Sequence, residues 1–119
     1  MNPLNVGTLP ACQRLMNAGI VLETDAKWIL WPTGLIELVG RAEYGDADVK
    51  VYYAPSMAEV WRELPGTEEL MPLLAKYAKG KNEFWYAMNP IRFLIELFRD
   101  IDRMISLLIW LTEQRKEKV

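Results

Sequence analysis

A tight turn between two apolar segments is the feature that most restricts the fold of this chain. Residues 27–31 and 35–39 are rich in Trp, Ile, Leu and Val, and they flank the tripeptide Pro32-Thr33-Gly34. Proline sets φ at the first corner of a turn, and glycine takes the left-handed position of a three-residue hairpin loop. The pattern predicts an antiparallel β-hairpin, which needs further strands or helices to bury its faces.

Two more segments have the composition of strands. Residues 49–53 read Val-Lys-Val-Tyr-Tyr and residues 83–88 read Glu-Phe-Trp-Tyr-Ala-Met, with the β-branched and aromatic residues typical of sheets. Neither residues 27–31 nor residues 83–88 alternate apolar and polar side chains, as a strand with one wet face does. We expect either helices on both faces of the sheet, or a partner or second copy of the chain on one face.

Two helices are marked by their caps. Thr8 precedes a helix over residues 9–18, and Gly19 supplies the left-handed residue that ends it. Ser56 and Glu59 have the Ser-x-x-Glu spacing of a capping box, directly before an apolar helical stripe. Both segments are therefore predicted to be helical.

Two further helices are expected in the second half of the chain. Thr67 is the predicted N-cap of a helix that Pro72 bends or splits. Asn89-Pro90 starts the last helix, which either is one long rod or breaks near Asp100. Its apolar residues repeat with helical spacing at Ile91, Leu94, Phe98, Ile101, Ile105 and Leu108. The sequence predicts a single α+β domain over residues 1–119, with an antiparallel sheet of about four strands, the hairpin plus two, and three to four helices.

The chain of 119 residues contains no histidine and one cysteine, Cys12. This composition lacks the commonest general base and metal ligand, and it does not allow a Ser-His or Cys-His pair or a structural zinc site. No glycine-rich phosphate loop is present. We expect no cofactor, no metal and no conventional catalytic residue, with Cys12 buried as a small apolar residue.

Charge and hydropathy indicate a cytoplasmic protein. The net charge of −2, from 14 basic and 16 acidic residues, argues against a dedicated nucleic-acid binder. The N-terminus lacks the basic and apolar regions of a signal peptide. The longest apolar run, residues 104–111, is too short to cross a bilayer. We therefore expect no membrane association.

The sequence leaves open two functions besides protein binding: an enzyme of unusual type and a weak nucleic-acid binder. An enzyme based on carboxylates or tyrosines needs a pocket that holds at least two of Glu23, Asp25, Glu37, Glu43, Tyr52 and Tyr53. Weak binding of a single-stranded nucleic acid is the other, because aromatic residues 84–86 follow a basic run. The three lysines of that run, Lys76, Lys79 and Lys81, are also explained as the favourable charge at a helix C-terminus.

Surplus apolar side chains favour a protein-interaction module. Beside its helical repeat, the last helix carries further apolar residues that one buried stripe does not need. A monomer rarely exposes so large an apolar patch. We predict a dimer through this helix or through an aromatic sheet face, or binding to another protein. The candidate surface residues are Trp28, Trp31, Trp85, Phe93, Leu97, Met104 and Trp110.

Three segments carry a resemblance to a known group of proteins. Residues 9–20 (LPACQRLMNAGI), 54–65 (APSMAEVWRELP) and 106–111 (SLLIWL) resemble, in order and spacing, small uncharacterised proteins encoded by bacteriophages and prophages of gut-type bacteria. The resemblance implies a phage accessory protein that acts in the bacterial cytoplasm, without a defined activity or catalytic residue. A narrower expectation is an inhibitor that binds a component of a host defence system.

Overall fold

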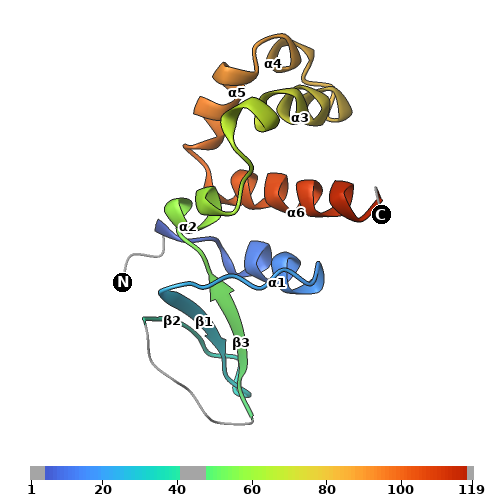
Figure 1. The fold of residues 1–119 in the computed structure, drawn as a ribbon. Coiled ribbons are helices and arrows are strands. Elements are labelled where there is room, and N and C mark those ends of the chain that lie inside the picture. The colour runs from blue at the N-terminus through green and yellow to red at the C-terminus, as the bar shows by residue number, and fades with distance from the viewer. Residues whose placement is uncertain (1–4, 41–47, 118–119) are drawn as a thin grey trace. The chain divides into compact units, whose positions relative to one another are not determined.

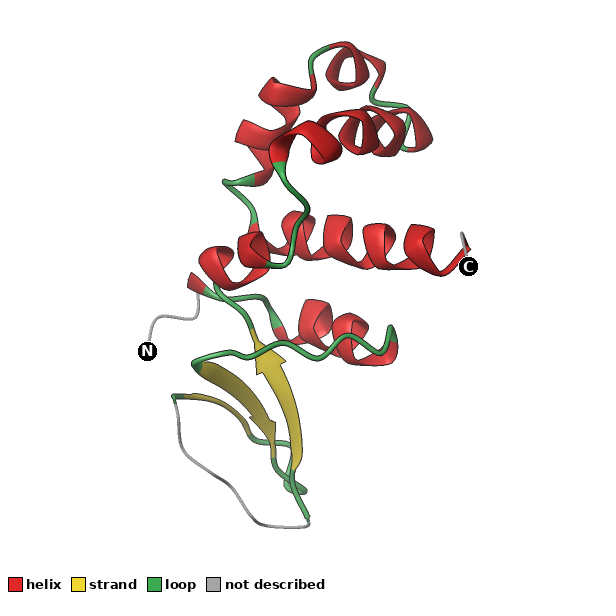
Figure 2. Ribbon diagram, viewed as in Figure 1, coloured by secondary structure: helices red, strands yellow, loops and turns green. Residues whose placement is uncertain are grey.

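The computed structural model describes residues 5–40 and 48–117, with side chains to residue 116. The expected α+β class is confirmed (Figures 1 and 2), but the described residues form three strands and six helices. The chain divides into two compact units, Met1–Glu59 and Val60–Val119, which are described separately below. The expectation of a single domain stays a prediction. The elements are α1 (Leu9–Asn17), β1 (Ala26–Leu30), β2 (Ile36–Val39), β3 (Lys50–Ala54), α2 (Met57–Arg62), α3 (Thr67–Gly80), α4 (Phe84–Met88), α5 (Pro90–Leu97) and α6 (Ile101–Glu117).

The sheet of the first unit has the order β2-β1-β3, with both pairs antiparallel. The predicted hairpin joins β1 to β2. Trp31 N–H donates to Leu35 O at 2.9 Å, Gly34 N–H donates to Trp31 O at 2.9 Å, and Gly34 has φ +89°. This is the three-residue loop that the Pro-Thr-Gly sequence predicts. Residues 40–48, whose polar sequence with Gly45-Asp46 predicts a loop, lie largely outside the described residues.

One face of this sheet packs on α1 and on the segment before it. The buried cluster consists of Val6, Cys12, Ala26 and Ala54, with Trp28, Leu38 and Tyr52 partly buried against it. Trp28 Nε1 donates to Gly7 O at 2.8 Å, and Cys12 Sγ lies 3.5 Å from the same oxygen. On the opposite face Ile29 is fully buried, so that face is not bare either.

The predicted capping box at the start of α2 is confirmed. Ser56 N–H donates to Glu59 Oε1 at 2.8 Å, and Glu59 N–H donates to Ser56 Oγ at 3.3 Å. The second carboxylate oxygen, Glu59 Oε2, accepts from Asp25 N–H at 2.9 Å. One side chain therefore links the residue before β1 to the first turn of α2.

In the second unit, α3 begins one residue earlier than predicted. Its N-cap is Gly66, and Thr67 is the first helical residue, so Thr67 is not a side-chain cap. Leu70 N–H donates to Gly66 O at 2.9 Å, which closes the first turn. The helix continues through Pro72, so of the two expected alternatives, a bend or a split, the split is wrong. Proline removes one backbone donor inside a helix without necessarily ending it.

The predicted fourth strand, residues 83–88, is the short helix α4. Glu83 N–H donates to Ala78 O at 2.9 Å and Ala87 N–H donates to Glu83 O at 3.1 Å, so these groups bond locally and not across a sheet. Helix α4 packs against both α3 and α5 (Figure 1). Packing between helices has overridden the β-propensity of the aromatic residues.

The sequence predicts that the last helix either is one long rod or breaks near Asp100. The structure has two helices, α5 and α6, so the break is confirmed. Asn89 Oδ1 accepts from Arg92 N–H at 3.4 Å and caps α5. Asp100 Oδ1 accepts from Asp102 N–H at 3.1 Å and Arg103 N–H at 3.4 Å, at the start of α6. The chain therefore breaks at Asp100, which serves as the cap of the next helix.

Candidate interaction site

Helices α4 and α5 expose large apolar side chains of the second unit. Met88 is the most exposed, at 87 % of its full accessible area, and Trp85 is at 60 %. An apolar group of this size, left in water, is typical of a binding surface. We refer to the following six side chains as the apolar surface: Phe84, Trp85, Met88, Ile91, Ile95 and Phe98.

Helical spacing aligns these side chains. Phe84 and Met88 are four residues apart on α4, and Ile91 and Ile95 are four apart on α5. Met88 and Ile91 lie on either side of the Asn89-Pro90 junction, three residues apart, so their Cα atoms are at most about 11 Å apart. Exposed apolar residues of the two helices therefore lie close to each other on both sides of the junction.

The inner faces of the same helices hold the apolar surface in place. The Tyr86 ring of α4 lies 4.9 Å from the Phe93 ring of α5, and Phe93 lies 6.1 Å from the Tyr77 ring of α3. Phe93 and Leu97 are buried. Each short helix is thus fixed by packing on one side while its other side is exposed.

A charged stripe runs beside the apolar residues of α5. Glu96 Oε1 lies 3.7 Å from Arg92 Nη2 and 3.5 Å from Arg99 Nη1, so one carboxylate is shared by two guanidinium groups. The Arg92 and Arg99 side chains are 51 % and 69 % exposed. This stripe carries one net positive charge and offers several N–H donors that Glu96 cannot satisfy.

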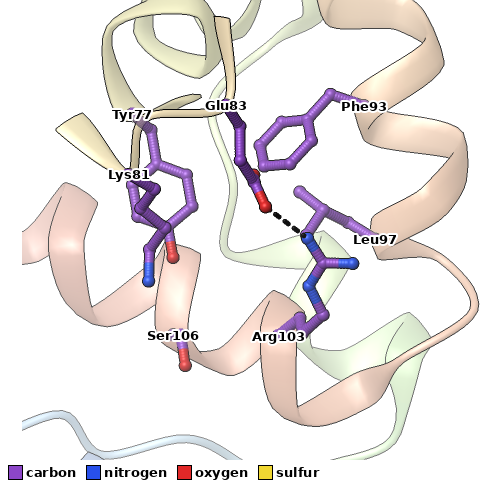
Figure 3. Close-up of a pocket in the computed structure, with 7 residues that line it drawn as sticks. All are labelled: Tyr77, Lys81, Glu83, Phe93, Leu97, Arg103 and Ser106. Atoms are coloured by element: carbon purple, nitrogen blue, oxygen red, sulfur yellow. Dashed lines mark ion pairs between the residues drawn. The ribbon is translucent and has the colours of Figure 1, made fainter. Parts of the chain in front are cut away.

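A small cavity of about 140 Å³ lies among α3, α5 and α6 of the second unit (Figure 3). Its lining residues are Tyr77, Lys81, Glu83, Phe93, Leu97, Arg103 and Ser106. Glu83 Oε1 lies 3.6 Å from Arg103 Nη2, and Figure 3 shows this pair projecting toward the ring of Phe93. The Arg103 guanidinium carbon is 5.8 Å from the centre of that ring, and Lys81 Nζ is 5.1 Å from the centre of the Tyr77 ring.

The chemistry of this cavity is that of a small polar binding pocket. Glu83 Oε2 is buried without a hydrogen-bond partner among the described residues, so it calls for a donor such as water or a small amide. A cavity near 150 Å³ holds a molecule about the size of benzene. Ser106 Oγ donates to Asp102 O at 3.0 Å, and Glu83 is paired with Arg103. The cavity thus offers one acceptor and two cations to a small ligand.

The described residues proposed for carboxylate or tyrosine catalysis, which include the half-buried Glu37 of β2, lie on the sheet and on the segment before β1. Tyr52 and Tyr53 follow each other on β3, so they project to opposite faces of the sheet. Glu23 and Asp25 are exposed, and Glu43 lies outside the described residues. None of the described residues among them lines the cavity above or the second hollow, of about 320 Å³, beside the hairpin loop.

Residues 5–40 and 48–117 offer neither a cluster of metal ligands nor a membrane span. In these ranges no three Cys, Asp or Glu side chains are grouped so that they could hold a metal ion. Over the same ranges no helix has the length and apolar character needed to cross a bilayer. Cys12 is a buried thiol whose Sγ faces Gly7 O.

The residues predicted for an interaction surface are dispersed. Trp28 and Trp31 are partly buried in the first unit, where Trp31 lines the hollow beside the hairpin. Trp110 packs on Tyr77 with ring centres 5.2 Å apart. Trp85 belongs to the apolar surface. The other three, Phe93, Leu97 and Met104, are buried and add nothing to an accessible surface.

Most of the apolar surface lies outside the set of residues that the sequence predicts. Phe84, Met88 and Ile95 are not in that set, and the helical repeat places Ile91 and Phe98 in a single buried seam. The sequence signal that points to this surface is the possible N-cap at Asp100, because a break there ends any continuous apolar stripe from α5 into α6. With the break in place, Ile91, Ile95 and Phe98 form a separate face of α5.

Similarity to known proteins does not extend these observations. Searches against protein-family models, curated proteins and solved structures gave no match to this chain.

Proposed function

We propose that this chain is a non-enzymatic protein-interaction module that binds a partner protein through the apolar surface of α4 and α5. One observation carries the proposal: large apolar side chains stand exposed on helices whose opposite faces are packed. Burying one such side chain is worth roughly 1.5–3 kcal/mol, so a partner that covers several of them gains substantial affinity.

The proposal includes a setting. The segments at residues 9–20, 54–65 and 106–111 resemble phage and prophage proteins, which supports an accessory protein acting in the cytoplasm of a bacterial host. In that setting the partner is a host or phage protein, and a component of a host defence system is the narrower form of the same proposal. Self-association into a dimer stays a separate prediction.

Differential capture from a bacterial lysate tests the proposal. The tagged chain is compared with a Trp85→Ser/Met88→Ser variant, and both are first checked for unchanged circular dichroism. Val21→Ser is the matched control, because Val21 is 77 % exposed but lies in the first unit. We expect proteins that the parent chain and the control retain and that the surface variant loses. Equal retention by all three chains, or retention of nothing by the parent chain, would overturn the proposal.

A further inference from the structure

The apolar surface lies in the most basic part of the chain. Residues 76–99 contain five basic and two acidic side chains, a net charge of +3 by subtraction, whereas the whole chain has −2. Each of the two carboxylates already lies near a guanidinium: Glu83 is 3.6 Å from Arg103, and Glu96 is shared by two arginines. The region therefore has positive charge that its own carboxylates do not balance.

The arginines are placed in register with the apolar residues. Arg92 and Glu96 each follow an apolar residue of α5, Ile91 and Ile95, so the charged stripe lies about 100° around the helix from the apolar stripe. Both stripes extend past the helix end, to Phe98 and Arg99. On the other side of the apolar stripe the next residues are Pro90, Leu94 and Leu97. A partner that covers the apolar stripe thus meets cations along one flank only.

We infer that the segment which covers this surface is an amphipathic helix of a partner protein with carboxylates along one flank; this rests on the proposed function above. Arg92 and Arg99 are seven residues apart, which corresponds to two helical turns or about 10 Å. Carboxylates on the partner helix at the same two-turn spacing can pair with both. Charged residues that flank an apolar seam set partner choice in the same way in coiled coils.

Other occupants fit the arrangement less well. A second copy that docks in parallel through the same face sets the arginine flank against the uncharged flank of Pro90, Leu94 and Leu97, where the arginines gain no ion pair. An antiparallel copy in register sets arginine against arginine, which like charges disfavour. A single-stranded nucleic acid stacks on rings, but half of the apolar surface is aliphatic: Met88, Ile91 and Ile95. An anionic bilayer surrounds an inserted apolar face with negative charge, whereas the cations of α5 lie on one side.

Two matched synthetic peptides test the inference. Both are amphipathic helices of about three heptads with the same leucine seam, and one flank carries Glu in the first peptide and Lys in the second. Binding is measured by fluorescence anisotropy, with a thymidine oligonucleotide and vesicles of phosphatidylglycerol and phosphatidylcholine as further ligands. We expect the acidic peptide to bind at least about tenfold tighter than the basic one, from two flanking ion pairs gained and two repulsions avoided.

Variants assign the effect to the two stripes. Arg92→Glu/Arg99→Glu is expected to reverse the preference for the acidic peptide. Arg92→Gln/Arg99→Gln is expected to abolish this preference, and it replaces the first variant in the test if that variant folds poorly. Trp85→Ser/Ile91→Ser is expected to abolish binding of both peptides. Failure of the acidic peptide to bind, or an unchanged preference in the arginine variants, overturns the inference.

The peptide experiment separates failure of the inference from failure of the proposed function. If both peptides bind equally and both depend on Trp85 and Ile91, the partner class is wrong while the docking surface stands. If the oligonucleotide or the vesicles bind through Trp85 and Ile91 more tightly than the acidic peptide, a nucleic acid or a membrane is the occupant and the inference falls. If lysate capture is also independent of the apolar surface, the proposed function fails as well.

Discussion

We predict that removal of the Glu59 carboxylate destabilises the first unit far more than is usual for a side chain on a short helix. Glu59 Oε1 accepts from Ser56 N–H at 2.8 Å and Oε2 accepts from Asp25 N–H at 2.9 Å. Both lengths are typical of charge-assisted hydrogen bonds. The carboxylate joins two segments that are 34 residues apart in sequence, so it closes a loop that contains the whole sheet.

The magnitude follows from these two bonds. A hydrogen bond to an ionised group contributes about 1.5–3 kcal/mol, and the partly buried bond to Ser56 falls in that range. The bond to Asp25 is exposed, so water replaces much of it and about 0.5–1 kcal/mol remains. The higher helix propensity of alanine returns a few tenths of a kcal/mol. We therefore expect Glu59→Ala to lower the free energy of unfolding by about 2–3 kcal/mol.

Two comparison variants sharpen the test. Glu59→Gln keeps one acceptor oxygen in place of two and is expected to lower the free energy by about 1 kcal/mol. Glu63→Ala is the control, because the Glu63 side chain is 44 % exposed and only reaches Arg62 at 4.0 Å; its expected effect is below about 0.5 kcal/mol. Urea unfolding followed by circular dichroism gives the values, with the m-value checked for constancy. Amide exchange at Asp25 and Ser56 should become faster in Glu59→Ala. The same loss of stability in Glu63→Ala, or unchanged exchange at both amides, would refute the reasoning.

Further substitutions test other parts of the fold by the same urea titration. Phe93→Ala should lower the free energy of unfolding by about 3–5 kcal/mol, since the ring is fully buried, whereas Phe84→Ala on the exposed surface should change it by less than about 0.5 kcal/mol; similar effects would contradict the assignment of the two faces. Asp100→Ala removes the cap that separates α5 from α6 and should cost about 1 kcal/mol, with Asp100→Asn close to the parent chain. Gly34→Ala should cost about 1 kcal/mol because φ is +89° there. Gly80→Ala in α3 should instead raise stability by up to about 1 kcal/mol, because the added Cβ would meet nothing within 4 Å apart from its chain neighbours and the nearby backbone of α3. The opposite order would show that backbone conformation is not decisive.

Local signals in the sequence predict most of the helix and strand boundaries. The Pro-Thr-Gly loop, the Ser56 and Glu59 capping box and the Asn89 cap all act within a few residues, so their side chains specify backbone geometry without help from the rest of the chain. Gly19, with φ +75°, ends α1 as its position predicts. In these places the sequence carries the physical cause of the structure directly.

Non-local packing accounts for what the sequence does not predict. Residues 84–86 are aromatic and prefer a strand when considered alone, but in the structure Tyr86 packs on Phe93 and α4 packs against its helical neighbours. A short apolar run cannot be assigned to strand or helix by periodicity without knowing what it will contact. For this reason the described residues form three strands, one fewer than the predicted count of about four.

Because residues 83–88 are predicted as a strand, the sequence also fails to show which of their side chains are exposed. In a strand, Phe84, Tyr86 and Met88 share one face, and Trp85 lies on the other. In a helix, Tyr86 lies about 200° around the axis from Phe84, so it turns toward Phe93 while Phe84, Trp85 and Met88 stay in water. The exposed surface thus arises from the conformation of five residues as much as from their composition. A change that forced this segment into an extended form would remove the surface without altering any of its side chains.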